Sequence, residues 1–250
     1  MPLLTAIPIP GIEEIKPGDP LPDIILAALR AHRMEFARGD ILVVTHKIVS
    51  KAEGRLAPLE GVRPRAAARR WARQHKLDGR VVELALAQAV RIVRKRRGVL
   101  ITETPQGFVC ANSGVDASNV DGGRSVALLP RDPDVSAQRI YRELKRRAGF
   151  PVPVIITDTF GRPWREGLTE VAIGLAGMKA FRDFRRRRDP HGYRLRVSLE
   201  AVADELACMA GLACGKLSRL PACMIRGFEY APGRGRARDL IRPAERDLFR

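Results

Sequence analysis

Short apolar runs bounded by turn residues recur along the chain and predict buried strands. The run at 40–45 follows a Gly-Asp turn and is almost entirely apolar, as in a strand covered on both faces. The run at 152–157 is rich in β-branched residues, and its prolines stand only near the beginning, which a strand tolerates. Similar runs predict strands at 99–102, 108–111, 126–129, 171–175, 194–198 and 222–225.

Apolar residues at helical spacing predict helices between these runs. Residues 64–97 are rich in Ala, Arg and Val and predict two helices with a break near Asp78 and Gly79. A further helix is expected to begin near Asp134, with Ser136 as a second capping candidate. Its expected buried stripe is Val135, Ile140, Leu144 and Ala148. A last amphipathic helix carries on one face Leu199, Val202, Ala203, Leu206, Ala210 and Ala213.

The order of these elements indicates the fold class. Strands and helices interleave, but without the regular alternation of a doubly wound sheet, so we expect a mixed α/β (α+β) fold with antiparallel pairs. No internal repeat or linker divides residues 1–250, and a single domain is expected. No apolar run is long enough to span a membrane. The four cysteines form no CxxC pair, which disfavours structural zinc and disulfides and favours a reduced, cytoplasmic setting.

The net charge of +17 is the unusual global property of the chain. Such a charge attracts polyanions, either nucleic acid or small phosphate-bearing ligands. It is equally explained by arginines that cover solvated helix faces. Aromatic residues, which form the stacking platforms for single strands, make up only 5% of the chain. No helix-turn-helix, zinc finger or RNA-binding signature accompanies the charge, and both interpretations stay open.

Residues 111–119 are the first candidate for chemistry. The segment follows a predicted strand and gathers two amides, two hydroxyls and the carboxylate of Asp116. Mg²⁺ and Mn²⁺ prefer oxygen ligands, and Mg²⁺ usually takes only one or two protein carboxylates. Asp116 is therefore a candidate metal ligand, and Asn119 a candidate partner for a phosphate or ribose oxygen. The alternative is a polar turn whose side chains cap their own backbone.

The second candidate lies at the end of the strand predicted at 152–157. Asp158 and Thr159 offer a carboxylate and a hydroxyl where open α/β sheets place ligands. A carboxylate and a hydroxyl together hold metal in nucleotide enzymes. Arg162 and Arg165 follow and can bind a carboxylate or phosphate through paired hydrogen bonds. The alternative is a strand-end turn with a surface arginine pair.

Two further segments carry weaker signals. Residues 46–55 include Lys51 and Arg55, which suit phosphate, but the segment lacks a P-loop pattern and is equally explained as a basic helix start. Residues 214–220 follow the last amphipathic helix, and Gly215 is first of all a helix cap. A phosphate-binding loop is the sharper alternative there. No histidine lies near Cys214 in sequence to form a nucleophile pair.

Together these motifs resemble those of the coenzyme F420-0:L-glutamate ligase family. The resemblance rests on Lys51-Ala52-Glu53-Gly54-Arg55, on 112–119, on Thr157-Asp158-Thr159 and on Gly161-Arg162-Pro163-Trp164-Arg165. It continues through 204–207, 225–227 and 247–249 and so covers nearly the whole chain in order. It implies GTP-dependent amide formation between L-glutamate and the phospholactyl carboxylate of F420-0, with further glutamates added through γ-linkages. It also implies two divalent ions, Mn²⁺ or Mg²⁺, stimulation by K⁺, and an intertwined homodimer with family-specific mixed sheets.

The resemblance also implies roles for particular residues. Metal would be held by Asp116, Asp158 and Thr159. Guanine nucleotide would be contacted by Ile12, Glu13, Glu14, Ile15, His46, Lys47, Lys51 and Asn119. The loop that would close over the nucleotide is Cys214, Gly215, Lys216, Leu217, Ser218, Arg219 and Leu220. Arg162 or Arg165 would steady a substrate carboxylate during catalysis.

One position departs from the family pattern. Family members carry an acidic residue in the closing loop that helps to bind metal, whereas this chain has Lys216. A protonated lysine is no metal ligand, and we expect Lys216 to neutralise phosphate instead. Because of this departure, a homologue with altered catalysis that only binds nucleotide remains an alternative to the ligase, as does a basic nucleic-acid-binding protein.

Overall fold

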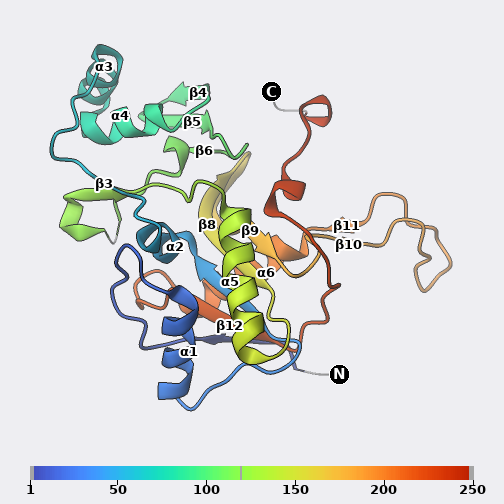
Figure 1. The fold of residues 1–250 in the computed structure, drawn as a ribbon. Helices are drawn as coiled ribbons and strands as arrows, with labels where there is room; N and C mark the ends of the chain where they lie inside the picture. Colours follow the sequence, from blue (N-terminus) through green and yellow to red (C-terminus); the bar gives the residue numbers. More distant parts are fainter. Residues whose placement is uncertain (1–2, 119, 248–250) are drawn as a thin grey trace.

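The computed structural model describes residues 3–118 and 120–247, and Figure 1 shows the arrangement of its elements. The helices are α1 (Leu21–Ala31), α2 (His46–Ala52), α3 (Ala66–His75), α4 (Gly79–Ala87), α5 (Pro133–Ala148) and α6 (Val202–Cys214). The strands are β1 (Thr5–Pro8), β2 (Ile41–Thr45), β3 (Leu56–Pro58), β4 (Arg91–Arg96), β5 (Val99–Glu103), β6 (Val109–Ala111), β7 (Ser125–Ala127), β8 (Val154–Arg162), β9 (Arg165–Ala176), β10 (Arg182–Asp183), β11 (Leu199–Glu200) and β12 (Ala222–Arg226). No helix in the described part of the chain is both long and apolar enough to cross a membrane.

A mixed five-stranded sheet forms the centre of the molecule, in the order β1-β12-β2-β8-β9. Only β2 and β8 run parallel, and their register places Thr45 opposite Thr157. The other neighbours are antiparallel. The carboxyl ends of β2 and β8 therefore reach the same edge of the sheet. The expected mixed α/β class with antiparallel pairs is confirmed.

Both faces of the central sheet are covered, because alternate strand residues point to opposite sides. Leu42 and Val44 of β2 face a core shared with α1 and α5. Ile41 and Val43 face a second core, shared with α6. Figure 1 shows α1 and α5 in front of the sheet and α6 behind it. This cover explains why the run at 40–45 is apolar throughout.

A smaller unit lies beyond the edge where β2 and β8 end (Figure 1). It comprises α3, α4, the three-stranded sheet β4-β5-β6 and the pair β3-β7. It has its own small apolar clusters, one centred on Val126 and Leu128 and the other on Ala72 and Leu100. The smaller unit meets the central sheet where Phe108 packs edge-on against Phe160 of β8, with ring centroids 6.2 Å apart.

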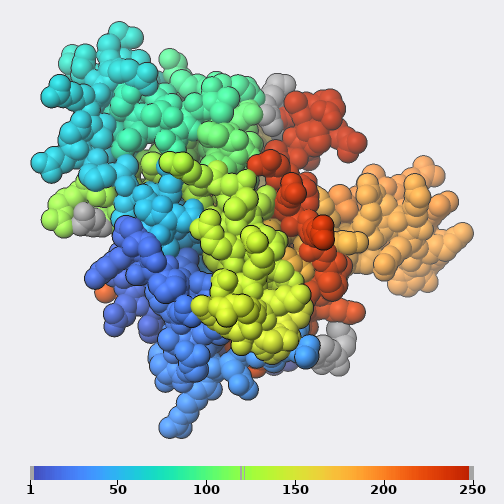
Figure 2. Space-filling view, in the orientation of Figure 1, coloured from blue at the N-terminus to red at the C-terminus, as the bar shows by residue number. Residues whose placement is uncertain are grey.

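A long connection between β10 and β11 projects away from the body of the molecule, as Figures 1 and 2 show in orange. It contains the basic run 185–188. Near its tip, Asp189 accepts backbone hydrogen bonds from His191 and Tyr193. The strand predicted at 194–198 is wrong. Within that range the ladder is reduced to one isolated bridge, between Arg188 and Arg194, and the strand itself is Leu199–Glu200.

Several other predictions need correction. Residues 91–96 form strand β4 rather than the end of a helix, because Arg97 and Gly98 adopt positive φ values that allow a tight turn into β5. Helix α5 is capped by Asp132, and Val135 is half exposed instead of joining the buried stripe. In α6 the buried face ends with Cys214, whereas Leu199 precedes the helix and Ala213 is exposed.

Candidate functional site

The site is built at the edge where the parallel strands β2 and β8 end. Strand β2 leads directly into α2, whose first two residues are His46 and Lys47. Strand β8 continues past this edge and carries Asp158 and Thr159. The sequence interpretation placed Asp158 in a loop, but residues 158–162 extend β8 and pair with β9. An irregularity of the ladder between Ile156 and Thr157 marks the point at which the site begins.

His46 joins the two strands at this edge. Its side chain is only 2% exposed, and Nε2 lies 3.3 Å from Oδ1 of Asp158. These two atoms are close but not aligned as a hydrogen bond, so Nε2 has no hydrogen-bond partner in the described residues. The other ring nitrogen, Nδ1, lies 3.3 Å from the hydroxyl of Ser50. Because buried polar atoms are normally hydrogen-bonded, Nε2 marks a place where a further polar group would fit.

The segment carrying Asp116 is shaped by a tight reversal after β6. Asn112 and Ser113 both adopt positive φ, and the hydroxyl of Ser113 donates to the Ala85 carbonyl. Ser113 also receives support from Thr102, whose hydroxyl oxygen accepts the Ser113 backbone N–H. Asp116 then pairs through its backbone with Ala127. The polar-turn alternative is confirmed for one oxygen of Asp116, Oδ1, which accepts the backbone N–H of Ser118, whereas Oδ2 of Asp116 faces Lys47.

Lys47 connects the Asp116 segment to α2. Its ammonium lies 2.8 Å from Oδ2 of Asp116 and donates to the hydroxyl of Ser118. The other carboxylate oxygen of Asp116 accepts the Ser118 backbone N–H at 2.7 Å. Burial acts to raise the pKa of Asp116, but the hydrogen bonds from Lys47 and Ser118 outweigh it and hold the pKa below its ordinary value. Asp116 is thus kept ionised at the site.

A third carboxylate, which the sequence analysis missed, belongs to Glu170. It stands opposite Thr159 in the β8–β9 register, and the Thr159 hydroxyl donates to its Oε1 at 2.6 Å. The ammonium of Lys216 donates to the Thr159 hydroxyl and lies 3.1 Å from the same oxygen of Glu170. In the sequence, Glu170 is marked only as a single acid directly before the apolar run at 171–175. The strand register is needed to show that it faces Thr159.

The stretch from Ile12 to Ile15 lies against α2, and its contact with nucleotide stays a prediction. Lys51 of α2 donates to the carboxylate of Glu14 at 2.5 Å. Ile12 and Ile15 pack into the core beneath. The Lys51 side chain is buried, whereas the Glu14 side chain is exposed.

The other predicted residues fall into three places. Helix α6 ends at Cys214 and is capped by Gly215, as expected. The loop to β12 brings Lys216 to Thr159, while Leu217 is exposed. Arg162 and Arg165 pair at the exposed end of the β8–β9 hairpin. The Arg162 guanidinium donates to the Glu166 carbonyl, and the role of both arginines stays a prediction. Asn119 lies outside the described residues.

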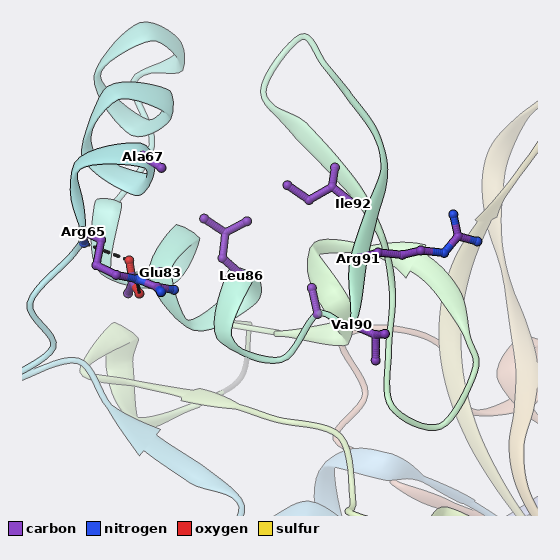
Figure 3. Close-up of a pocket in the computed structure, with 8 residues that line it drawn as sticks. Arg65, Ala67, Glu83, Leu86, Val90, Arg91 and Ile92 are labelled. Atoms are coloured by element: carbon purple, nitrogen blue, oxygen red, sulfur yellow. Dashed lines mark hydrogen bonds and ion pairs between the residues drawn. The ribbon is translucent and has the colours of Figure 1, made fainter.

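A separate hollow lies in the smaller unit, away from these groups. Figure 3 shows Leu86 and Ile92 pointing into it from α4 and β4, with Arg65 bonded to Glu83 at one end. None of the predicted site residues lines it. Its mostly apolar lining and its position give it no role in the chemistry at the sheet edge.

The oxygen donors at the edge suit a hard divalent ion. Asp116, Asp158, Glu170 and the Thr159 hydroxyl are the ligand types that Mg²⁺ and Mn²⁺ prefer. Within residues 3–118 and 120–247, no three His, Cys, Asp or Glu side chains come together as a metal cluster. An ion here would therefore rely on one or two carboxylates and complete its shell with water or substrate phosphate, as is usual for Mg²⁺.

Comparison with known proteins finds relatives that match almost the entire chain. The sequence profile described as F420-0:Gamma-glutamyl ligase matches residues 11–227. The chain is 40% identical over 250 residues to the coenzyme F420:L-glutamate ligase of Methanothermobacter thermautotrophicus, covering 99% of each protein. It is 42% identical over 255 residues to the ligase of that name from Methanopyrus kandleri, covering 100% of this chain and 99% of the relative. The Archaeoglobus fulgidus ligase of that name is 38% identical over 244 residues, with 97% and 95% covered. The chain therefore belongs to the F420-0:gamma-glutamyl ligase family.

Proposed function

We propose that the protein joins L-glutamate to the terminal carboxylate of coenzyme F420-0 through an amide bond, with GTP as the energy source. The observation that carries the proposal is the meeting of four separate segments at one sheet edge. His46 touches Asp158, Lys47 touches Asp116, and Lys216 touches Thr159. Family membership supports the reaction, because the relatives are named for it. Further glutamates are added in the same way through γ-linkages.

The reaction proceeds through an acyl phosphate. A free carboxylate is a poor acyl donor, so an oxygen of the F420-0 carboxylate attacks the γ-phosphorus of GTP and the bond to the β-phosphate oxygen breaks, releasing GDP. The neutral amine of glutamate then attacks the acyl carbon, phosphate leaves, and the amine proton passes to solvent. Little covalent chemistry falls to the protein, which contributes position and charge.

The residues at the edge have distinct tasks in this scheme. Asp116, Asp158 and Thr159 would hold Mn²⁺ or Mg²⁺, which when bound neutralises charge on the transferred phosphoryl group. Lys47 and Lys51 supply further positive charge on the α2 side, where Ile12–Ile15 and the loop 214–220 enclose the nucleotide. Arg162 or Arg165 steadies a substrate carboxylate. K⁺ is proposed as a stimulating ion.

We also propose that the protein acts as a homodimer. The exposed end of the β8–β9 hairpin carries Trp164 at 77% and Leu168 at 66% exposure, and the β10–β11 connection carries Val197 at 86%. Large apolar side chains that are exposed on the surface favour a protein partner. Light scattering on the purified protein tests this, and a monomer at micromolar concentration would refute it.

The function is tested by incubating the protein with F420-0, L-glutamate, GTP and Mn²⁺. The expected result is a glutamyl product together with GDP and phosphate. Oxygen-18 placed in the F420-0 carboxylate should appear in the released phosphate, and its absence would rule out the acyl phosphate. Binding of GTP without product would instead favour the homologue with altered catalysis. Duplex binding that survives roughly 0.2 M salt would favour the nucleic-acid alternative.

A further inference from the structure

Lys216 and Glu170 are in contact, but their side chains differ greatly in exposure to solvent. The Lys216 side chain is 67% exposed, and it stands in the short loop between α6 and β12. The Glu170 side chain is only 15% exposed. An exposed ammonium thus reaches in to a largely buried carboxylate and also donates to the hydroxyl of Thr159. The Lys216 ammonium therefore lies next to the Thr159 hydroxyl, on the side of the α6–β12 loop.

Glu170 is held in place from two directions. The Thr159 hydroxyl donates to its carboxylate from β8. From the other side, α6 passes so closely that a Cβ on Gly211 would stand 2.4 Å from Cγ of Glu170. Cys208 of the same helix approaches the Glu170 carbonyl. The carboxylate is therefore a fixed group, whereas its lysine partner is a long side chain on an exposed loop.

Each carboxylate at this edge has a basic side chain beside it. Asp116 has Lys47 and Asp158 has His46. Lys216 plays this part for Glu170, but it differs from Lys47 because it is far more exposed, at 67% against 22%. Exposed ion pairs contribute little to stability, so Lys216 is the cation most easily displaced.

We propose that Glu170 and the Thr159 hydroxyl are oxygen ligands of a divalent ion that takes at most one further protein carboxylate, and that Lys216 is a tethered cation which competes with this ion for Glu170 and Thr159. The inference rests on the proposed metal-dependent function and deepens it. An ammonium and a divalent cation repel each other at contact distance, so binding of the ion at Glu170 expels Lys216. The released ammonium is a flexible point charge suited to the phosphates of the nucleotide. Nucleotide, by drawing Lys216 away, strengthens binding of the ion, and by reciprocity the ion strengthens binding of the nucleotide.

The direct test measures binding of Mn²⁺ alone, by the electron paramagnetic resonance signal of the free ion, with no substrate present. Lys216→Met removes the charge and keeps most of the stem, and it should bind Mn²⁺ about threefold to tenfold more tightly than the wild type. Glu170→Gln should bind more weakly. In the double variant, Lys216→Met should give no gain, because the carboxylate for which the two cations compete is gone. The matched control is Lys145→Met on the exposed side of α5, which should leave Mn²⁺ affinity unchanged.

A second readout separates competition from a structural role. In Lys216→Met the Mn²⁺ concentration for half-maximal activity should fall while the KM for GTP rises, a pair of opposite changes that simple loosening of the loop does not produce. Equal Mn²⁺ affinity in Lys216→Met and the wild type, or a gain that persists in the double variant, would overturn the competition and leave the proposed ligase intact. No Mn²⁺ binding by any variant, with or without GTP, would overturn both.

Discussion

The two halves of the β8–β9 hairpin differ sharply, although they belong to the same pair of strands. In the half that begins β8 and ends β9, residues such as Ile155 are fully buried, and Ile155 lies in the core shared with α6. In the half around Trp164, the side chains are exposed. Asp158, Thr159 and Glu170 lie in the short intermediate stretch between them. The candidate site therefore lies where the core ends. The buried half of the hairpin holds its backbone in place, and the exposed half leaves it open to substrate.

The largest effect is expected for ligase activity when Asp158, between the buried and exposed halves of the hairpin, is changed. Asp158→Asn keeps the shape of the side chain but removes its charge, and we expect kcat/KM for ligation to fall by about 10²–10³. The unfolding transition in urea should change little, because the Asp158 side chain lies outside the main cores. If Asp158→Asn ligates at the wild-type rate, the Asp158 carboxylate takes no part in the reaction.

The stability of the two halves is the next contrast. Ile155→Ala leaves a cavity in the α6 core and should lower the free energy of unfolding by about 2–5 kcal/mol. Leu168→Ala, at a side chain that is 66% exposed, should change it by less than about 0.5 kcal/mol. Urea denaturation of both variants provides the comparison. Similar losses in the two would mean that a partner buries the exposed half as deeply as the core.

A smaller change in stability and activity is expected where α6 packs closely on Glu170. Gly211→Ala forces Glu170 or the helix to shift and should cost about 1–3 kcal/mol, with a loss of ligase activity beyond the loss of folded protein. Gly161→Ala in the exposed half is the control, because its added Cβ meets only Leu168 at 3.8 Å. Thermal unfolding and activity are measured on both. Unchanged activity in folded Gly211→Ala would show that the position of Glu170 is unimportant.

The smallest effect concerns the pH dependence of the Asp116–Lys47 pair. Because the pKa of Asp116 is held below its ordinary value, the pair contributes stability above about pH 4 and loses it as the pH falls through the lowered folded-state pKa. Lys47→Met should therefore be less stable than the wild type at pH 7 by about 0.5–1 kcal/mol, with the difference vanishing once the pH lies below the lowered folded-state pKa of Asp116. Urea denaturation across this range measures it. A difference that stays constant with pH, as expected for Lys145→Met, would contradict the pairing.

Local sequence signals predicted most of the fold. The apolar run of β2 and the turn residues around it were sufficient, because a strand buried on both faces has no polar positions. The same signals failed at 91–96, where arginines at helical spacing concealed a strand defined by the turn at Arg97 and Gly98. The wrong strand at 194–198 lies in a projecting arm, where no core imposes a register.

The site was predicted less completely, because its geometry arises from pairing between distant segments. Asp116 and Asp158 stood out as acids following strands. The contact of His46 with Asp158 depends on the parallel pairing of β2 and β8, which no local pattern specifies. Glu170 depends on the antiparallel register that sets it opposite Thr159. Lys216 was noticed only as a departure from the family pattern, and its partner could not be named from the sequence.

The most direct test of the account is mass spectrometry of F420-0 after incubation with L-glutamate, GTP and Mn²⁺. The wild type and Arg246→Ala, a surface control in the C-terminal segment, should both convert F420-0 into a product heavier by one or more glutamate residues, with one GDP formed per amide bond. Asp158→Asn should give almost none, although it folds. Unchanged F420-0 in the presence of folded wild-type protein, or equal conversion by Asp158→Asn, would contradict the account.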